Sequence, residues 1–330
     1  MKGAKGFILA AGFGKRMLPF TESVAKAALP FFGKPLAAWS LEALRGAGVE
    51  DVTVNLHHLG DTVKGALAPY VDDSFSLRWS EEETLLGTGG GVKRCISQFV
   101  GGELFLLNGD TFRELDLKRM AELHAQMDAV ATLALAPAEA GREAPIEVGP
   151  DGRIVKFLGA GPGGGRPCEF IGAHLFSPEG IEVIGAVEAT SFCINAEVNT
   201  RLVSRGAKVF GVVLGEDDWW CDLGTPERFM EGHIHFFHRG SLPPGCGGRL
   251  LTHSERADGG GEVIAPSWVA EGGVVEEDAT AGPYAVLGSG SRVAAGVTVQ
   301  STILFPGASA LSNKRGVLAA PGGLEVSLDL

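Results

Sequence analysis

Residues 1–240 alternate short apolar runs with amphipathic stretches. Runs of strand length occupy residues 6–10, 51–56, 75–79, 104–107, 129–136, 170–176 and 209–214. Apolar residues at helical spacing occupy residues 35–44, 61–70, 92–99, 116–126 and 195–205. This alternation is typical of a mostly parallel sheet with helices on both faces. We therefore expect an α/β, Rossmann-like fold.

Two local signals refine this picture. Residues 146–157 predict a hairpin that turns near Asp151-Gly152, because Asp-Gly pairs favour tight turns. Thr225-Pro226 predicts a helix start, with the threonine as N-cap and the proline at the first helical position.

The C-terminal part of the chain has a different period. Apolar or small residues recur every six positions at Val263, Val269, Val275, Ala281, Leu287, Val293, Val299, Phe305 and Leu311. A six-residue period predicts a short left-handed β-helix of hexapeptide repeats, in which three units complete one coil. Ser241-Leu242-Pro243-Pro244-Gly245 is the expected boundary, which gives a catalytic domain over residues 1–240 and a repeat domain over residues 241–330.

The loop after the first apolar run combines glycines with cations. Gly12-x-Gly14 follows the run, and Lys15, Arg16 and Lys26 come after it. Glycines let backbone N–H groups approach phosphate oxygens, and a guanidinium supplies a planar fork of donors. The glycine spacing alone fits an ordinary turn equally well.

Two further segments follow strand-like runs in the same way. One is the glycine run at residues 87–91, and the other is Asn108-Gly109-Asp110. Ligands of parallel α/β sheets bind outside the carboxyl ends of the strands. We therefore expect both segments and the first loop to meet at one edge of the sheet.

Asp110 and Asp222 each follow an apolar segment that should end at that edge. Mg²⁺ takes oxygen ligands from one or two carboxylates together with substrate phosphates. The pair therefore predicts a Mg²⁺ site beside a phosphate-binding loop.

Composition narrows the partners and the setting. The formal charge of −12 argues against a nucleic-acid partner. We see no signal peptide and no apolar run long enough to span a membrane. The five cysteines are scattered, without a Cys-x-x-Cys pair, which favours neither disulfides nor zinc and fits a reducing cytoplasm.

Together these motifs resemble the signature of the sugar-1-phosphate nucleotidylyltransferases, or nucleotide-sugar pyrophosphorylases. The resemblance rests on Leu9-Ala10-Ala11-Gly12-x-Gly14-x-Arg16 through Pro30, on Asn108-Gly109-Asp110, and on Trp220-x-Asp222-x-Gly224-Thr225-Pro226. It covers about residues 6–237. Within the family, the acidic run before Leu86-Gly87-Thr88-Gly89-Gly90 looks most like the mannose-1-phosphate guanylyltransferases.

The resemblance implies that a sugar 1-phosphate attacks the α-phosphorus of a nucleoside triphosphate and releases pyrophosphate. It implies catalytic roles for Arg16 and Lys26, and Mg²⁺ held by Asp110 and Asp222. Nucleotide binding is implied for Leu9, Ala10, Ala11, Gly12, Gly14, Gly87, Thr88, Gly89 and Gly90. The Glu-Lys-Pro that usually contacts the sugar phosphate is replaced by Leu158-Gly159-Ala160. Weaker candidates for that contact are Lys156, Glu169, Gly172 and Glu197.

Other functions stay open at this point. A uridylyltransferase or a heptose-phosphate relative fits the same motifs, and so does a non-catalytic nucleotide-sugar-binding regulatory subunit. An NAD(P) oxidoreductase is disfavoured, because Met17 stands where a dinucleotide-binding loop has its third glycine. The repeat region is short for an acyltransferase, and its expected role is structural, in a homo-oligomer.

Overall fold

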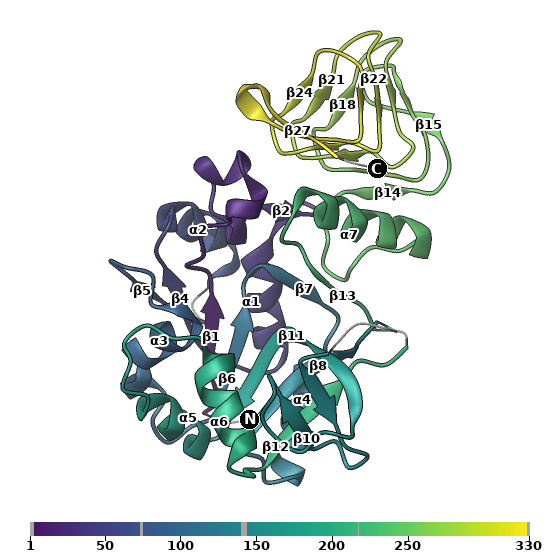
Figure 1. Cartoon of the computed structure of the whole chain (residues 1–330). Helices are drawn as coiled ribbons and strands as arrows, with labels where there is room; N and C mark the ends of the chain where they lie inside the picture. The colour runs from purple at the N-terminus through teal and green to yellow at the C-terminus, as the bar shows by residue number, and fades with distance from the viewer. Residues whose placement is uncertain (1–2, 73–74, 140–143, 217, 329–330) are drawn as a thin grey trace. The chain divides into compact units, whose positions relative to one another are not determined.

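In a computed structural model of the chain, residues 3–72, 75–139, 144–216 and 218–328 are described. The chain forms two compact units (Figure 1). The first contains the residues up to Phe13 together with Ala37–Asp222, and the second contains Gly14–Leu36 and Leu223–Leu330. These units do not coincide with a division at residue 240, and the assignment of a catalytic and a repeat domain on either side of it stays a prediction.

The first unit is built on one large sheet. Its strands lie in the order β10-β9-β11-β6-β1-β4-β5, and β8 and β12 continue the sheet from β11. Strands β6, β1, β4 and β5 run parallel to one another, as do β8 and β12, whereas β11 is antiparallel to β6, β8 and β9. The bounds are β1 Lys5–Leu9, β4 Asp51–Leu56, β5 Ser76–Glu81, β6 Leu104–Asn108, β8 Ala131–Pro137, β9 Ile146–Val148, β10 Ile154–Phe157, β11 Arg166–Phe176 and β12 Val209–Val213.

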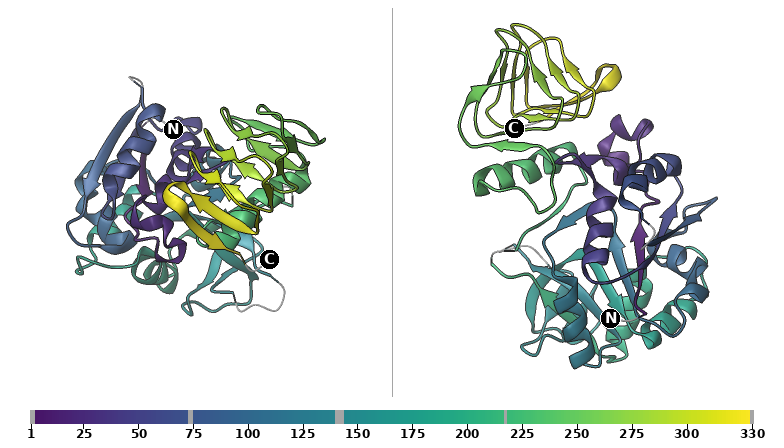
Figure 2. Two further views of the ribbon diagram at one scale, coloured as in Figure 1. Left: turned by 90° about the horizontal axis from the view of Figure 1, so that it is seen from above. Right: turned by 180° about the vertical axis from the view of Figure 1, so that it is seen from behind.

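Helices cover both faces of this sheet (Figures 1 and 2). Successive residues of a strand point to opposite faces, so Phe7 of β1 packs against Phe99 beside α3 while Gly6 faces Leu44 of α1. The helices are α1 Leu36–Gly46, α2 Gly60–Leu67, α3 Gly87–Arg94, α4 Leu117–Gln126, α5 Pro178–Gly185 and α6 Thr200–Ser204, with short 3₁₀ turns at Ala68–Tyr70 and Ile96–Gln98 and a π-helical turn at Asn195–Asn199. The predicted α/β, Rossmann-like fold is confirmed.

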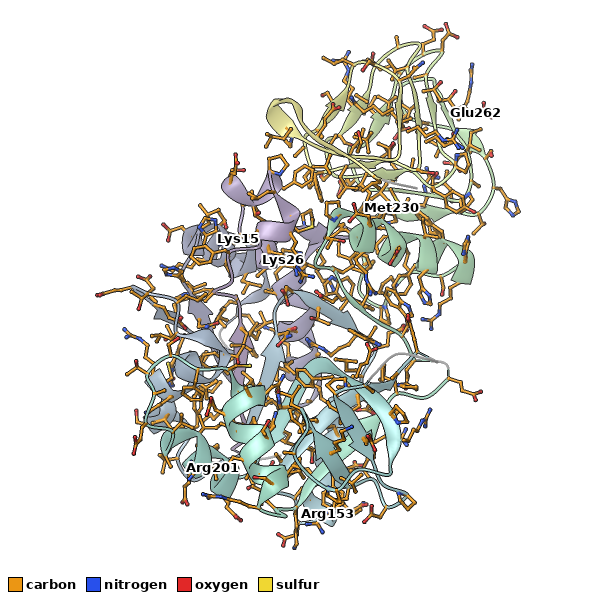
Figure 3. All side chains as sticks on the ribbon, viewed as in Figure 1. Lys15, Lys26, Arg153, Arg201, Met230 and Glu262 are labelled. Carbon is orange, nitrogen blue, oxygen red and sulfur yellow. The ribbon has the colours of Figure 1, made fainter. Side chains whose placement is uncertain are left out.

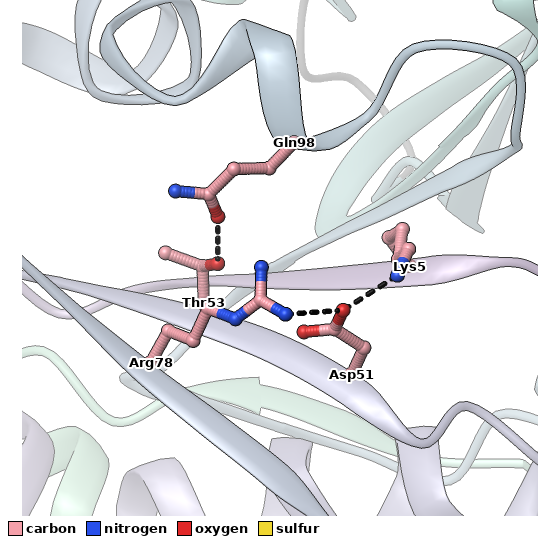
Figure 4. Close-up of polar contacts among 5 residues, drawn as sticks. All are labelled: Lys5, Asp51, Thr53, Arg78 and Gln98. Atoms are coloured by element: carbon pink, nitrogen blue, oxygen red, sulfur yellow. Dashed lines mark hydrogen bonds and ion pairs between the residues drawn. The ribbon is translucent and has the colours of Figure 1, made fainter.

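Charged side chains tie the amino-terminal ends of the parallel strands together (Figure 4). The Asp51 carboxylate of β4 accepts hydrogen bonds from Lys5 of β1 and, at 3.1 Å, from Arg78 of β5. Thr53 of β4 donates to Gln98 at 2.9 Å. These contacts lie at the end of the sheet opposite to the carboxyl-terminal edge, so they hold the strands in register without entering that edge.

Several local predictions match the structure. Strand β4 has the predicted bounds, residues 146–157 form the antiparallel β9–β10 hairpin, and α7 (Pro226–Arg239) starts at the predicted proline. The Thr225 hydroxyl caps α7 by accepting a hydrogen bond from the Arg228 amide at 3.3 Å. The helix predicted over residues 92–99 instead begins at Gly87, so the glycine run is helical. Among the described residues, no helix is long and apolar enough to cross a membrane.

The second unit joins the segment 14–36, helix α7 and the C-terminal repeats. The segment contains the 3₁₀ turns Lys15–Met17, Phe20–Glu22 and Lys26–Ala28, followed by the short hairpin of β2 Pro30–Phe31 and β3 Lys34–Pro35. Helix α7 buries Phe229, His233 and Phe236 against Phe31, and His233 also packs against Phe32.

The repeats form stacked coils of short strands, as Figures 1 and 2 show. Three parallel ladders run through them, β16-β19-β22-β25, β17-β20-β23-β26 and β18-β21-β24, with β14, β15 and β27 pairing antiparallel at the ends. The strands are β14 Arg249–Leu251, β15 Glu255–Arg256, β16 Glu262–Val263, β17 Ser267–Val269, β18 Val274–Val275, β19 Thr280–Ala281, β20 Val286–Leu287, β21 Arg292–Val293, β22 Thr298–Gln300, β23 Ile303–Leu304, β24 Ser309–Ala310, β25 Lys314–Arg315, β26 Val317–Ala320 and β27 Leu324–Ser327, with a 3₁₀ turn at Pro321–Gly323. This arrangement is consistent with the predicted β-helix.

The six-residue period is not kept to the end of the repeats: paired strands are eighteen residues apart at first, then seventeen, and fifteen in the last pairs, such as Val299 with Lys314. Glu262 pairs with Thr280, eighteen residues on, but Val286 pairs with Ile303, only seventeen residues on. Where the spacing shortens, the coil interior is filled by Leu304 and Ala310. The prediction that Phe305 and Leu311 continue the interior row is therefore wrong: Phe305 packs against Phe20 and Phe229, and Leu311 is 75% exposed.

Candidate active site

The first unit gathers several predicted site segments at the carboxyl ends of its parallel strands. Strand β1 lies between β6 and β4, and the chain passes from β5 back to β6 on the other side of β1. The point where strand order reverses is where such sheets bind ligands. Leu9 at the end of β1 pairs with Asn108 at the end of β6, so the first loop and the Asn108-Gly109-Asp110 turn are neighbours.

The first loop is held from both sides by its neighbours. The Ala10 amide donates to the Asn55 side chain at 2.8 Å, and the Gly109 amide donates to the Leu9 carbonyl at 2.9 Å. Gly12 is exposed, its φ is not positive, and a Cβ added there would meet no atom within 4 Å. Neither a positive φ nor close packing within the described structure therefore requires a glycine at 12. A glycine lets a ligand approach the backbone closely, and contact of Gly12 with a nucleotide stays a prediction.

A buried pair connects this loop to the glycine run. Asn55 at the end of β4 donates to the Glu82 carboxylate at 2.8 Å, and the Leu86 amide donates to the other carboxylate oxygen at 2.9 Å. Glu82 is only 4% exposed. The pair thus fixes Ala10 and Leu86 relative to each other. Sequence analysis missed both residues, although Asn55 is the one amide side chain in an otherwise apolar strand end.

The glycine run itself packs tightly against residues 190–192. The Gly89 amide donates to the Phe192 carbonyl at 2.9 Å, and a Cβ at Gly90 would lie 2.3 Å from the Thr190 carbonyl oxygen. The Thr88 hydroxyl accepts a hydrogen bond from the Ile194 amide at 2.9 Å. The structure thus gives Thr88, Gly89 and Gly90 packing roles, and their contact with a nucleotide stays a prediction.

The two predicted metal ligands come together through a two-stranded ribbon. Strand β7 (Thr111–Arg113) pairs antiparallel with β13 (Trp220–Asp222), and Asp222 lies opposite Thr111, the residue after Asp110. Among the described residues, no three His, Cys, Asp or Glu side chains group together. Mg²⁺ can take one or two carboxylates and complete its shell with water and substrate phosphates, and its binding by Asp110 and Asp222 stays a prediction.

A partly buried arginine, Arg113, donates hydrogen bonds to the acid-bearing turn and to two neighbouring elements. The Arg113 guanidinium donates to the carbonyls of Asn108 at 2.7 Å and Ile171 at 3.2 Å, and to the Ser40 hydroxyl at 3.3 Å. Burial lowers the pKa of Arg113 to about 10, and the nearby Asp110 carboxylate opposes this shift. Arg113 is therefore charged at neutral pH. Sequence analysis missed Arg113, because its hydrogen-bond partners come from three separate elements.

The predicted catalytic cations belong to the second unit. Gly14 has a φ of 63° and begins the turn Lys15–Met17, and the Thr21 hydroxyl donates to the Gly14 carbonyl at 3.0 Å. Lys15 and Arg16 are exposed, whereas Lys26 is 6% exposed. Figure 3 labels Lys15 and Lys26 on this segment. The catalytic roles of Arg16 and Lys26 stay predictions.

The four weaker sugar-phosphate candidates lie on three elements, β10, β11 and the π-helical turn, and their contact with a sugar phosphate stays a prediction. Lys156 pairs with Glu147 at 2.9 Å, and this hydrogen bond, with the amides of Gly165 and Gly164, lowers the pKa of Glu147. Glu169 lies within β11 and Glu197 is exposed on the π-helical turn. Gly172, with a φ of 79°, sits at the irregularity of β11, where an added Cβ would lie 3.0 Å from the Asn108 side chain. Of the four, Gly172 alone is shown in contact with the acid-bearing turn.

Comparison with known proteins identifies the family. The nucleotidyl transferase family model matches residues 5–237. A mannose-1-phosphate guanylyltransferase of Mycobacterium tuberculosis is 29% identical over 311 residues, covering 91% of this chain and 79% of that protein. A mannose-1-phosphate guanyltransferase of Pichia angusta is 28% identical over 283 residues, covering 80% and 72%.

Solved structures share the fold. HddC from Yersinia pseudotuberculosis, in complex with GMP-PN, superposes with a TM-score of 0.56 at 19% identity and covers 70% of this chain and 99% of that one. A Bacillus anthracis protein assigned as a glucose-1-phosphate thymidylyltransferase gives a TM-score of 0.60 at 20% identity, covering 70% and 94%. With the family model matching most of the chain, the protein belongs to the nucleotidyl transferase family, as an enzyme of the sugar-1-phosphate nucleotidyltransferase type.

Proposed function

We propose that the protein transfers a guanylyl group from GTP to mannose 1-phosphate in a Mg²⁺-dependent reaction, giving GDP-mannose and pyrophosphate. The observation that carries the proposal is the antiparallel pairing that sets Asp222 beside the Asp110 turn, next to the end of β1. The choice of guanine and mannose is supported by the names of the curated relatives that match most of the chain.

The chemistry fits this donor set. A phosphate monoester is largely dianionic at neutral pH, so its oxygen can attack the α-phosphorus without a general base. A bond forms between that oxygen and the α-phosphorus, and the bond to the bridging oxygen of the β-phosphate breaks. What the protein supplies is alignment and charge neutralisation. Bound Mg²⁺ would neutralise phosphate charge, and Asp110 and Asp222 are the residues that would hold it.

The other roles follow from the charge of the substrates. Arg16 and Lys26 would neutralise the triphosphate and stabilise the departing pyrophosphate. The backbone of Leu9 to Gly12, fixed by Asn55, would hold the nucleotide, together with the residues at the start of α3. Homo-oligomer formation through the repeats and a cytoplasmic location stay predictions of the sequence.

A pyrophosphate-release screen tests the proposal. Each nucleoside triphosphate is combined with each of several sugar 1-phosphates, in the presence and absence of Mg²⁺. We expect the highest kcat/KM with GTP and mannose 1-phosphate, and no turnover after chelation of the metal. A preference for UTP would move the protein to the uridylyltransferases, and no turnover with any pair would favour a regulatory subunit.

The metal assignment has a separate test. Asp110→Ala should abolish turnover while the far-ultraviolet circular dichroism spectrum and the unfolding midpoint stay close to those of the unaltered protein. Glu122→Ala, an exposed acid on α4, is the matched control and should keep full activity. Full activity in Asp110→Ala would refute the assignment of this carboxylate to the metal.

A further inference from the structure

The segment that carries the predicted catalytic cations has little regular structure of its own. Residues 14–36 form three 3₁₀ turns and a two-residue hairpin. Few hydrogen bonds close these turns. In the first, the Met17 amide donates to the Gly14 carbonyl at 2.8 Å, and in the third, the Ala28 amide donates to the Ala25 carbonyl at 2.8 Å. Short 3₁₀ pieces have poor hydrogen-bond geometry, so the conformation of this segment depends on what packs against it.

What packs against its first half is a residue of the repeats. The Phe20 ring meets the Phe305 ring edge to face, with centroids 5.2 Å apart and an interplanar angle of 75°. Phe305 also contacts Phe229 of α7, at 5.7 Å. Phe20 is 2% exposed and Phe305 is 5% exposed. The three rings form one apolar cluster that joins the segment, α7 and a coil.

The second half of the segment meets another coil. Phe32 packs edge to face on Trp268 of β17, with centroids 5.7 Å apart. Gly33 lies so close that an added Cβ would be 3.2 Å from the Trp268 ring. The indole N–H of Trp268 donates to the Gly247 carbonyl at 3.2 Å, which fixes the ring. Lys26 lies in the sequence between these two anchor points.

The coil that holds Phe20 is one where the repeat breaks its period. Because Val286 pairs with Ile303 at a spacing of seventeen, Leu304 turns into the coil interior and Phe305 turns away from it. An unbroken six-residue period would have placed Phe305 inside the coil. Because the period shifts by one residue, the Phe305 ring lies outside the coil and packs against the cation-bearing segment.

We propose that the C-terminal repeats position the cation-bearing segment for catalysis, with Phe305 and Trp268 as positioning residues for Arg16 and Lys26. The proposal rests on the proposed nucleotidyl transfer for its kinetic consequence, but its structural part does not. Effective catalysis by charge requires groups placed to within about an ångström, and such a misplacement costs on the order of a hundredfold in rate. The repeats are then part of the catalytic apparatus as well as a structural appendage.

Two substitutions in the full-length chain separate positioning from general stability. Phe305→Ala removes the ring that meets Phe20, whereas Leu304→Ala, one residue earlier, removes an interior side chain of β23. Both variants should unfold at a lower temperature than the unaltered protein. Only Phe305→Ala should accelerate amide hydrogen exchange over residues 14–30, and only it should lower kcat, by about ten- to a hundredfold. Phe305→Leu, which keeps an apolar side chain, should recover part of both losses and serves if Phe305→Ala fails to fold.

Hydrogen exchange also distinguishes the two proposals. If the unaltered protein shows no turnover with any substrate pair, the proposed function fails, yet faster exchange over residues 14–30 in Phe305→Ala still supports positioning by the repeats. Unchanged exchange over those residues in Phe305→Ala would overturn the inference, as would an equal increase in Leu304→Ala.

Discussion

Replacing Gly90 by alanine changes the stability of the protein in two opposing ways, through helix propensity and through packing. Gly90 lies inside helix α3, where alanine is normally preferred over glycine by about 1 kcal/mol. However, the new Cβ would lie 2.3 Å from the Thr190 carbonyl oxygen and 3.3 Å from the Ser191 Cα. Both are backbone atoms, so neither can be rotated out of the way.

The magnitudes decide the sign. A Cβ at 2.3 Å must move by roughly 1 Å before it reaches an ordinary contact distance, and such overpacking of a buried site costs about 1–3 kcal/mol. It would also strain the Gly89 amide to Phe192 carbonyl hydrogen bond beside it, which measures 2.9 Å. Subtracting the gain in helix propensity leaves a net destabilisation of up to about 2 kcal/mol.

Gly65→Ala is the matched control for this prediction. Gly65 also lies inside a helix, α2, but it is exposed and a Cβ there would meet nothing within 4 Å. It should raise the free energy of unfolding by about 1 kcal/mol. Urea unfolding followed by circular dichroism should therefore shift in opposite directions for the two variants. An equal increase in stability for Gly90→Ala would refute packing as the reason for the glycine.

Three further predictions concern the loop, its support and pH. Gly12→Ala should leave the urea midpoint unchanged, because the new Cβ meets no protein atom within 4 Å, but should raise the KM for the nucleotide severalfold in steady-state kinetics; an unchanged KM would show that the nucleotide does not approach this residue. Arg113→Met should lower the free energy of unfolding by about 3 kcal/mol, because buried carbonyls such as that of Asn108 lose a charged donor, and should raise the Mg²⁺ concentration needed for half-maximal activity. Burial lowers the pKa of His174 to about 4 and of His233 to about 3, so below about pH 6.5 the histidines of the unfolded chain take up protons before those of the folded chain. The free energy of unfolding should therefore fall as pH drops from about 6.5 to 4, by about 1.4 kcal/mol per pH unit for each ring, and the urea midpoint should fall with it. A midpoint that does not change over this range would contradict the burial of neutral histidines.

Where local signals dominate, the sequence predicted the structure closely. Strand β4 alternates polar residues with the apolar residues Val52, Val54 and Leu56, and α7 is preceded by the N-cap threonine and begins at a proline. In both cases the residues that set the bounds are adjacent to the element. The same holds for the meeting of the first loop with Asn108-Gly109-Asp110, because parallel strands deliver their carboxyl ends to one edge.

Where distant contacts dominate, sequence reasoning fell short. The start of α3 was placed five residues too late, because glycines disfavour helices unless close packing requires them, and the packing partner here is Phe192. The six-residue period was extended through Leu311, because the chain has an apolar residue at both neighbouring positions, Leu304 and Phe305, and then Ala310 and Leu311. The sequence therefore does not show that the period has shifted by one residue. Arg113 could not be assigned, because its acceptors come from Asn108, Ile171 and Ser40.

The missed residues share a physical property that bears on the proposed mechanism. Asn55 with Glu82, and Arg113 with Ser40, lie behind the carboxyl-terminal edge and bind the backbone of the segments that would meet the substrate. An unmade hydrogen bond costs most where water is excluded, so these buried contacts restrict the loops to a narrow range of positions. A phosphate nucleophile needs alignment rather than proton transfer, and the polar contacts in this unit therefore support the alignment that the proposed reaction requires. Rate should depend on these supporting residues, whereas the choice of base and sugar should depend on the groups that line the edge itself.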